Sequence, residues 1–120
     1  MKIVISLVLL LGLVFISLCA QPTQDIKQQA INACKNKCND FITSEGPLPL
    51  IWRGTFQEYL NTGPCIGDPL LNFTDWVCDA AHSPRQPVDD LAENQCSAYR
   101  EGRAKHFVEV DTNCNLIQAR

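Results

Sequence analysis

The stretch IKQQAINACKNKCNDFI (residues 26–42) sets the fold, because its apolar residues recur at intervals of three and four. This spacing predicts an amphipathic helix that ends before Gly46 and Pro47. The residues of the predicted inward face are Ile26, Ala30, Ala33, Cys34, Cys38, Phe41 and Ile42. Cys34 and Cys38 share this face, so each is expected to join the helix to another element rather than to the other.

The cysteine content predicts a disulfide framework. The chain has seven cysteines, and without Cys19 six remain, at Cys34, Cys38, Cys65, Cys78, Cys96 and Cys114. A domain of about 100 residues buries only a modest core, and exported domains of this size often add disulfides worth about 2–4 kcal/mol each. No C-x-x-C motif of the kind found in zinc sites occurs. The sequence therefore predicts three disulfides and leaves their pairing open.

Two stretches further along the chain, residues 76–81 (WVCDAA) and 105–110 (KHFVEV), have the alternation of β-strands. Residues expected to share a face are Trp76, Cys78 and Ala80 in the first stretch and His106, Val108 and Val110 in the second, with Phe107 and Glu109 opposite. The predicted class is α+β: a small disulfide-rich domain in which the N-terminal helix packs on a small antiparallel sheet.

The segments between these elements carry weaker signals. GPLPLIWRG (residues 46–54) is expected to be an extended connector. Thr55 and Glu58 have the spacing of a capping box and predict a short second helix, closed by Gly63 and Pro64. Residues 66–75 (IGDPLLNFTD) are expected to form a loop, in which Asn72 is a formal glycosylation acceptor.

Residues 88–100 fit two structures equally well. One is a helix with Leu91, Ala92, Cys96 and Tyr99 inward and Gly102 as its stop. The other is a hairpin that pairs residues 97–100 with residues 103–110 around Gly102.

The amino terminus predicts export. Residues 1–20 hold one lysine and then an apolar run, as in a signal peptide, and polar residues 21–24 form a tether before a single disulfide-stabilised domain at 25–120. The run is shorter than the roughly 20 residues of a spanning helix, so an uncleaved anchor is the second choice. Cleavage after Ala20 would release the protein. Residues 16–19 resemble the lipobox of bacterial and archaeal lipoproteins, although Leu18 replaces a small residue, so lipid attachment to Cys19 stays open.

Four segments resemble the C-terminal halves of small predicted exported archaeal proteins with six cysteines. They are PCIGDPLL (64–71), DWVCDAAHSPRQPVD (75–89), ENQC (93–96) and HFVEVDTNC (106–114). The resemblance spans about residues 63–115. It implies export and a shared cysteine framework, and it implies no activity and no catalytic residue.

The stretch CDAAHSPRQPVDDLAENQC (78–96) holds the candidate binding residues, Arg85, His82 and Asp79. Prolines 84 and 87 stiffen the backbone around Arg85, and a rigid loop loses little entropy on binding, as in protease inhibitors that insert an arginine into an acidic pocket. The competing interpretation is that Arg85 pairs with Asp79 or with Asp89 or Asp90 and only fixes the loop.

An enzyme is the alternative function. His82 and His106 could combine with nearby carboxylates, such as Asp79, Asp89 and Asp90, in a small hydrolase or around a metal ion. Ser83 is a poor partner for His82, because adjacent side chains on a strand point apart. No compact ligand spacing is present, so neither a metal nor a cofactor is expected.

The charge of the chain narrows its partners. The formal net charge is -3, which disfavours nucleic acid and anionic membrane surfaces. The expected partner of a secreted or cell-surface protein is another protein or a cell-envelope component, with membrane contact only through the signal or anchor. The preferred hypothesis is a non-enzymatic exported binding or structural module, presenting a rigid loop around Arg85.

Overall fold

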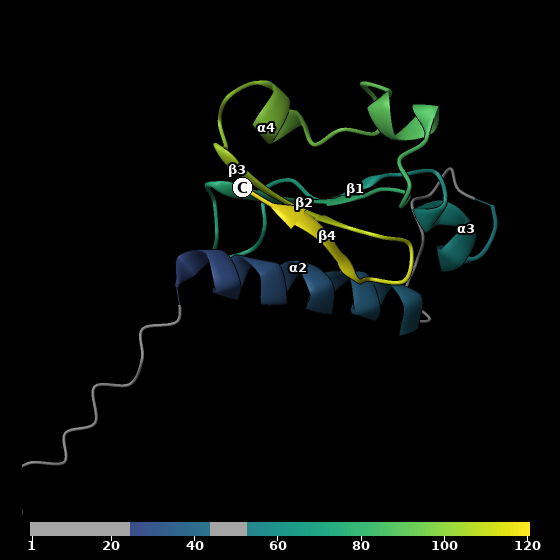
Figure 1. Cartoon of the computed structure of the whole chain (residues 1–120), viewed down its shortest axis with the longest axis horizontal. Coiled ribbons are helices and arrows are strands. Elements are labelled where there is room, and N and C mark those ends of the chain that lie inside the picture. The colour runs from purple at the N-terminus through teal and green to yellow at the C-terminus, as the bar shows by residue number, and fades with distance from the viewer. Residues whose placement is uncertain (1–24, 44–52) are drawn as a thin grey trace, which may run out of the picture.

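A long helix lies against one face of a four-stranded sheet (Figure 1). The computed structural model of the chain describes residues 25–43 and 53–120. The predicted signal peptide, the tether, Cys19 and most of the connector at 46–54 lie outside these residues. The elements are α2 (Ile26–Thr43), α3 (Phe56–Leu60), β1 (Cys65–Gly67), β2 (Trp76–Ala80), the 3-10 helix η1 (Pro87–Asp90), α4 (Ser97–Arg100), β3 (His106–Val110) and β4 (Leu116–Ala119).

Helix α2 confirms the helix predicted from its three-and-four spacing, but its buried stripe is narrower than predicted. The buried residues are Ala30, Ile31, Cys34 and Cys38. Ile26 is 63% exposed and Ile42 is also exposed, whereas Ile31 was not assigned to the face. Eight residues separate Ile26 and Ile42 from Cys34, which places each about 80° away around the helix and beyond the sheet.

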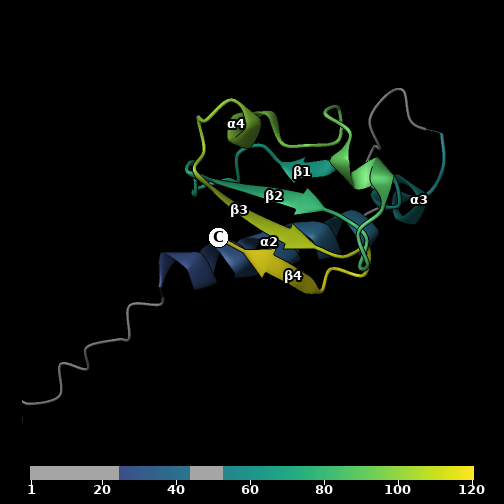
Figure 2. The same ribbon diagram turned by 45° about the horizontal axis from the view of Figure 1, so that its top comes forward.

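The sheet has the order β1-β2-β3-β4, and its central pair is parallel (Figure 2). The two outer pairs are antiparallel, so the sheet is mostly antiparallel. The predicted strands and their alternation are confirmed: Cys78 and Val108 pack with α2, while Val77 and Phe107 belong to a smaller cluster on the opposite face. The parallel pair requires a crossover, residues 81–105, which runs over that opposite face. We call it the crossover face.

Neither structure expected for residues 88–100 forms. Instead the segment contains η1, a turn at residues 92–94 and the single-turn helix α4, which Gly102 ends at a φ of +75°. The Asp68 carboxylate accepts hydrogen bonds from the backbone N–H groups of Ser97 and Ala98. A contact from the distant 68–70 region therefore fixes the start of α4.

Two further strands were not predicted. β1 includes Ile66 and Gly67, so the loop expected at 66–75 is shorter, and β4 pairs with β3. Asn72 is exposed in a turn of the remaining loop, with a φ of +66°. The capping box at Thr55 is confirmed, because its hydroxyl accepts from the Glu58 N–H and its own N–H donates to the Glu58 carboxylate.

All six predicted cysteines form disulfides. The pairs are Cys34–Cys78, Cys38–Cys114 and Cys65–Cys96. The first two join α2 to the sheet region, as the helix pattern predicted, and the third joins β1 to the crossover. These bonds indicate an oxidising, extracytoplasmic environment. Within residues 25–43 and 53–120, no helix is long and apolar enough to cross a bilayer.

Candidate functional site

Two carboxylic acids lie side by side on the crossover face. Asp79 of β2 and Glu109 of β3 are partners in the parallel register, and neighbouring strands are about 4.8 Å apart. Glu109 is only 5% exposed, and burial of two adjacent acids is unfavourable unless they are neutralised. The next residues along the crossover supply that neutralisation.

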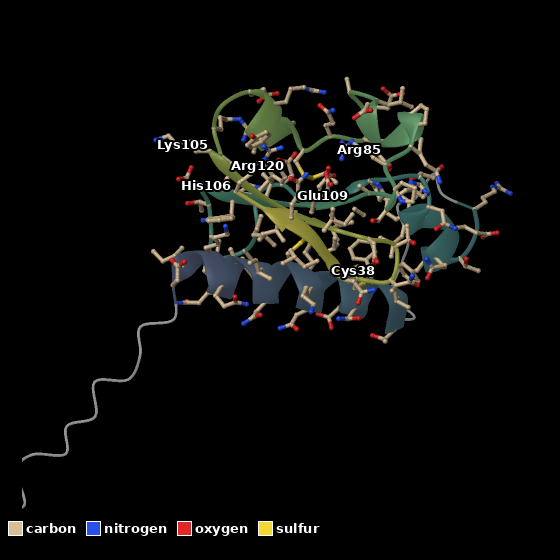
Figure 3. The ribbon with its side chains drawn as sticks, viewed as in Figure 1. Cys38, Arg85, Lys105, His106, Glu109 and Arg120 are labelled. Carbon is tan, nitrogen blue, oxygen red and sulfur yellow. A yellow bond between two sulfur atoms is a disulfide. The ribbon has the colours of Figure 1, made fainter. Side chains whose placement is uncertain are left out.

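Arg85 neutralises part of this cluster. Its Nη1 donates to Glu109 Oε2 at 2.6 Å, its Nε donates to Asp90 Oδ1 at 2.8 Å and its Nη2 donates to the Asp89 carbonyl at 3.2 Å. Figure 3 shows Arg85 beside Glu109, on the side of the sheet away from Cys38 of α2. The arginine thus pairs with Asp90, as the loop-fixing interpretation expected, and also with Glu109. A guanidinium held in this way is not a free side chain for a protease pocket.

His82 belongs to a separate anchor built around Asp89. The buried Asp89 carboxylate accepts from His82 Nδ1 at 2.9 Å, from the His82 N–H at 3.1 Å and from the Gln86 N–H at 2.8 Å. Burial would raise the pKa of Asp89, but the hydrogen bonds from Gln86 and His82 outweigh it and lower the pKa. His82 is therefore bonded within the fold and holds the turn that carries Arg85.

Asp79 is the member of the cluster that lacks a full set of partners. Its Oδ1 is the buried side-chain oxygen or nitrogen without a hydrogen bond among the described residues. Burial raises the pKa of Asp79 to about 8, and the charges of Glu109 and Asp89 act in the same direction, against Arg85. Asp79 consequently holds a proton at neutral pH.

A cavity of about 140 Å³ opens beside these acids. Its apolar wall is formed by Val77, Cys96, Tyr99 and Phe107, and its polar wall by Asp79, Arg85, Gln95, Arg100 and Glu109. The Tyr99 and Phe107 rings meet edge to face with centroids 5.1 Å apart. Apolar and aromatic side chains on one wall and converging polar groups on the other are usual features of a binding site for a small group. We call this cavity the crossover pocket.

His106 lies far from this pocket and from His82. It pairs with Trp76 at the first position of the parallel register, whereas His82 follows the last position, which puts them about 20 Å apart along the strands. The His106 ring stacks on Trp76 with centroids 4.6 Å apart and lies 3.7 Å from Asp75. The structure therefore does not bring the two histidines together.

The potential metal-binding group found in the described chain is Cys65, Asp68 and Cys96. Both of its sulfurs are joined in a disulfide, and Asp68 caps α4, so these atoms are already engaged. The acids and histidines considered as ligands from the sequence do not form such a group there.

Sequence reasoning found Asp79 and Arg85 but missed most of the pocket. The missed residues are Gln95, Tyr99, Arg100, Phe107 and Glu109. One signal was available: Glu109 interrupts a run of β-branched residues and shares a face with Phe107, and an acid in such a position needs a partner. That Asp79 lies beside Glu109 could not be predicted, because the sequence pattern did not indicate that the two strands pair in parallel.

The fold and the site together define a small disulfide-bonded α+β domain with a charged pocket on one face of its sheet. Comparisons of the chain with family models, curated proteins and solved structures found no match.

Proposed function

We propose that the protein is an exported binding module whose ligand, part of a protein or cell-envelope component, enters the crossover pocket. The observation that carries this proposal is the half-buried Asp79 side chain, which lines the pocket and has one buried oxygen without a partner among the described residues. Native proteins rarely leave such a group unsatisfied, because its desolvation costs about 1–3 kcal/mol. A bound ligand can offset that cost.

The surroundings of the pocket support a preformed site. Cys96 in its wall is bonded to Cys65, and Arg85 connects the crossover to Glu109 of β3. Both links restrict the walls before any ligand arrives, which reduces the entropy lost on binding. Arg85 contributes by shaping the site rather than by projecting from it.

The proposed location is outside the cytoplasm, either released or tethered. The disulfides support export, and the sequence of residues 1–20 supports a signal with two outcomes, cleavage after Ala20 or lipid attachment to Cys19. Intact mass spectrometry of the protein recovered from its native host distinguishes them, because a lipid adds mass to a chain that begins at Cys19. A mature chain with free thiols at the six other cysteines would contradict this location.

Binding in the pocket is tested by amide NMR spectra of the oxidised, exported protein titrated with a library of small polar molecules. We expect shifts at Val77, Tyr99 and Phe107. A Gln95→Trp variant should abolish these shifts, because the half-buried Gln95 lines the pocket and the larger indole would fill it. Gln28→Trp, on the exposed surface of α2, is the matched control and should leave them unchanged. If every compound leaves the three signals unmoved, the pocket is not a binding site.

A hydrolase remains the second candidate, on one observation. A protonated Asp79 beside Glu109 is the combination of acid and base that hydrolysis uses. The two-histidine form of this hypothesis is disfavoured by the separation of His82 and His106. Turnover of chromogenic esters or glycosides by the wild type, lost in Asp79→Asn, would favour the enzyme over the binding module.

A further inference from the structure

Two of the three charged side chains that act on Asp79 are negative. On β3, Glu109 faces it. From the crossover, Asp89 also raises the pKa of Asp79, whereas the charge of Arg85 and a backbone hydrogen bond from Ala80 lower it. The charge of Arg85 is already shared between two carboxylates, Asp90 and Glu109. The remaining cation of the pocket, Arg100 on α4, is exposed and donates to the Ala92 carbonyl.

The walls next to this negative end are apolar and aromatic. Val77 is almost fully buried, and the Phe107 ring meets Tyr99 edge to face. Aromatic rings attract cations through their faces and also pack against alkyl chains. The pocket thus has a carboxyl at one side and a surface suited to a short hydrocarbon chain at the other.

We propose that the crossover pocket binds an alkyl ammonium group, with its nitrogen at Asp79 and its carbon chain against Val77, Tyr99 and Phe107. This inference rests on the proposed function and names its ligand class. An ammonium carries one positive charge and three N–H donors, so it can hydrogen-bond to the Asp79 carboxyl and stabilise its ionised form beside Glu109.

The size of the pocket agrees with this class. Its volume is about 140 Å³, and an apolar protein cavity of about 150 Å³ is known to accept a molecule as large as benzene. A butylammonium group, which is the end of a lysine side chain, has fewer heavy atoms than benzene. The site therefore fits either a free small amine or a lysine side chain of a partner protein.

Binding should release a proton. In the free protein at neutral pH, Asp79 is protonated, and the proton balances the local charge. When the ammonium enters, the Asp79 carboxyl loses its proton to solvent and the resulting carboxylate pairs with the ammonium. The net charge of the pocket is thus unchanged, because the ammonium replaces the released proton. Affinity should rise with pH until Asp79 is ionised in the free protein.

The test is an NMR titration of the oxidised, exported protein with n-butylammonium chloride at constant ionic strength. With Asp79 at a pKa of about 8, the dissociation constant should be about 50-fold smaller at pH 8 than at pH 6. The uncharged analogue 1-butanol should bind more weakly and without pH dependence. An equal affinity for the two compounds, or no change between pH 6 and pH 8, would overturn the proposal.

Two variants locate the effect. Asp79→Asn keeps the shape of the protonated side chain but cannot ionise, so we expect loss of amine binding. Asp40→Asn removes a carboxylate from the exposed surface of α2 and is the matched control, with unchanged binding. If Asp79→Asn binds butylammonium as tightly as the wild type does, Asp79 is not the site. The pH dependence of the wild type is an independent readout should Asp79→Asn fold poorly.

Further measurements distinguish a protein partner from a free amine, and failure of the ligand class from failure of the proposed binding function. Tighter binding of a lysine-containing peptide than of butylammonium, lost when norleucine replaces the lysine, would identify a protein partner, whereas binding of the free amine alone would identify a small molecule. If the library of small polar molecules shifts the pocket signals but amines do not, the inference about the ligand class fails and the binding module stands. If nothing shifts them, both fail.

Discussion

The two faces of the sheet are built on different principles. On the α2 face, the helix packs on a buried apolar cluster that includes Leu60, Val108 and Val110. Two disulfides link the helix to the sheet region on this face. On the crossover face, short helical turns cover a smaller cluster, buried acids and a cavity, with one disulfide. The difference indicates that one face supplies most of the stability, and that the other can hold polar groups that stability alone would not favour.

Removal of an α2-face disulfide should have the largest effect on stability and the smallest on the pocket. Cys38 and Cys114 are separated by 76 residues, so replacing both with alanine should lower the free energy of unfolding by about 4 kcal/mol. Urea unfolding followed by tryptophan fluorescence measures this loss. The amide signals of Val77 and Phe107 should stay in place.

The corresponding change on the crossover face should give a different result. Replacing Cys65 and Cys96 with alanine should also destabilise the protein, and it should additionally move the signals of Val77 and Phe107, because Cys96 is part of the pocket wall. If the two double variants disturb the pocket equally, the two faces are not independent.

A smaller effect on stability is expected from a substitution at Gly63, which lies next to Asp89 of the crossover. Its φ is +67°, and a Cβ there would lie 2.5 Å from Asp89 Oδ1. The Asp89 carboxylate is held in place by three hydrogen bonds from His82 and Gln86, one to Oδ1 and two to Oδ2. Gly63→Ala should cost about 2–3 kcal/mol. Gly102→Ala is the matched control, since its φ is +75° but nothing lies within 4 Å, and it should cost about 1 kcal/mol. Equal losses of thermal stability would show that Asp89 moves freely.

The pH dependence of stability should report the buried acid of the crossover face. The pKa of Asp79 is raised to about 8 in the folded protein and is near 4 in the unfolded chain, so the folded state binds more protons between these values. The contribution of Asp79 to stability should therefore be fully present below about pH 4, fall by on the order of 1 kcal/mol per pH unit up to about pH 8, and then level off. Denaturation of Asp79→Asn should lack this decline, so a wild-type profile that parallels it would contradict a buried, protonated Asp79.

The smallest effect concerns the cap of α4. Asp68 accepts hydrogen bonds from the N–H groups of Ser97 and Ala98 and from the Ser97 hydroxyl. Burial would raise its pKa, but these bonds and Arg103 lower it. Asp68→Asn should cost about 1 kcal/mol, and hydrogen exchange should quicken in α4 but not in α2. Faster exchange in α2 as well would mean that the faces unfold together.

The α2 face was predictable from the sequence because its pattern is local. The spacing of Ala30, Cys34 and Cys38 gave the helix, and the alternation around Cys78 and Val108 gave the two strands. The crossover face was not predictable from the sequence, because its structure depends on contacts between residues far apart in the chain. These contacts join Asp68 to Ser97, Cys65 to Cys96 and Asp79 to Glu109. Residues 88–100 looked equally helical or extended for this reason. Arg85 was recognisable as a partner for acids, but Glu109 required knowledge of the parallel strand pair.

The order of the cysteines has a consequence for how the molecule matures. None of the six pairs with the next cysteine along the chain: Cys34 passes over Cys38 and Cys65 to reach Cys78, and Cys65 passes over Cys78 to reach Cys96. In the proposed export from the amino terminus, Cys34 and Cys38 meet oxidant before their partners arrive. Early bonds between neighbours must then be exchanged for the native ones by attack of free thiolates. Production of the protein should accordingly depend on an isomerase or a glutathione buffer, and rapid air oxidation should trap scrambled forms.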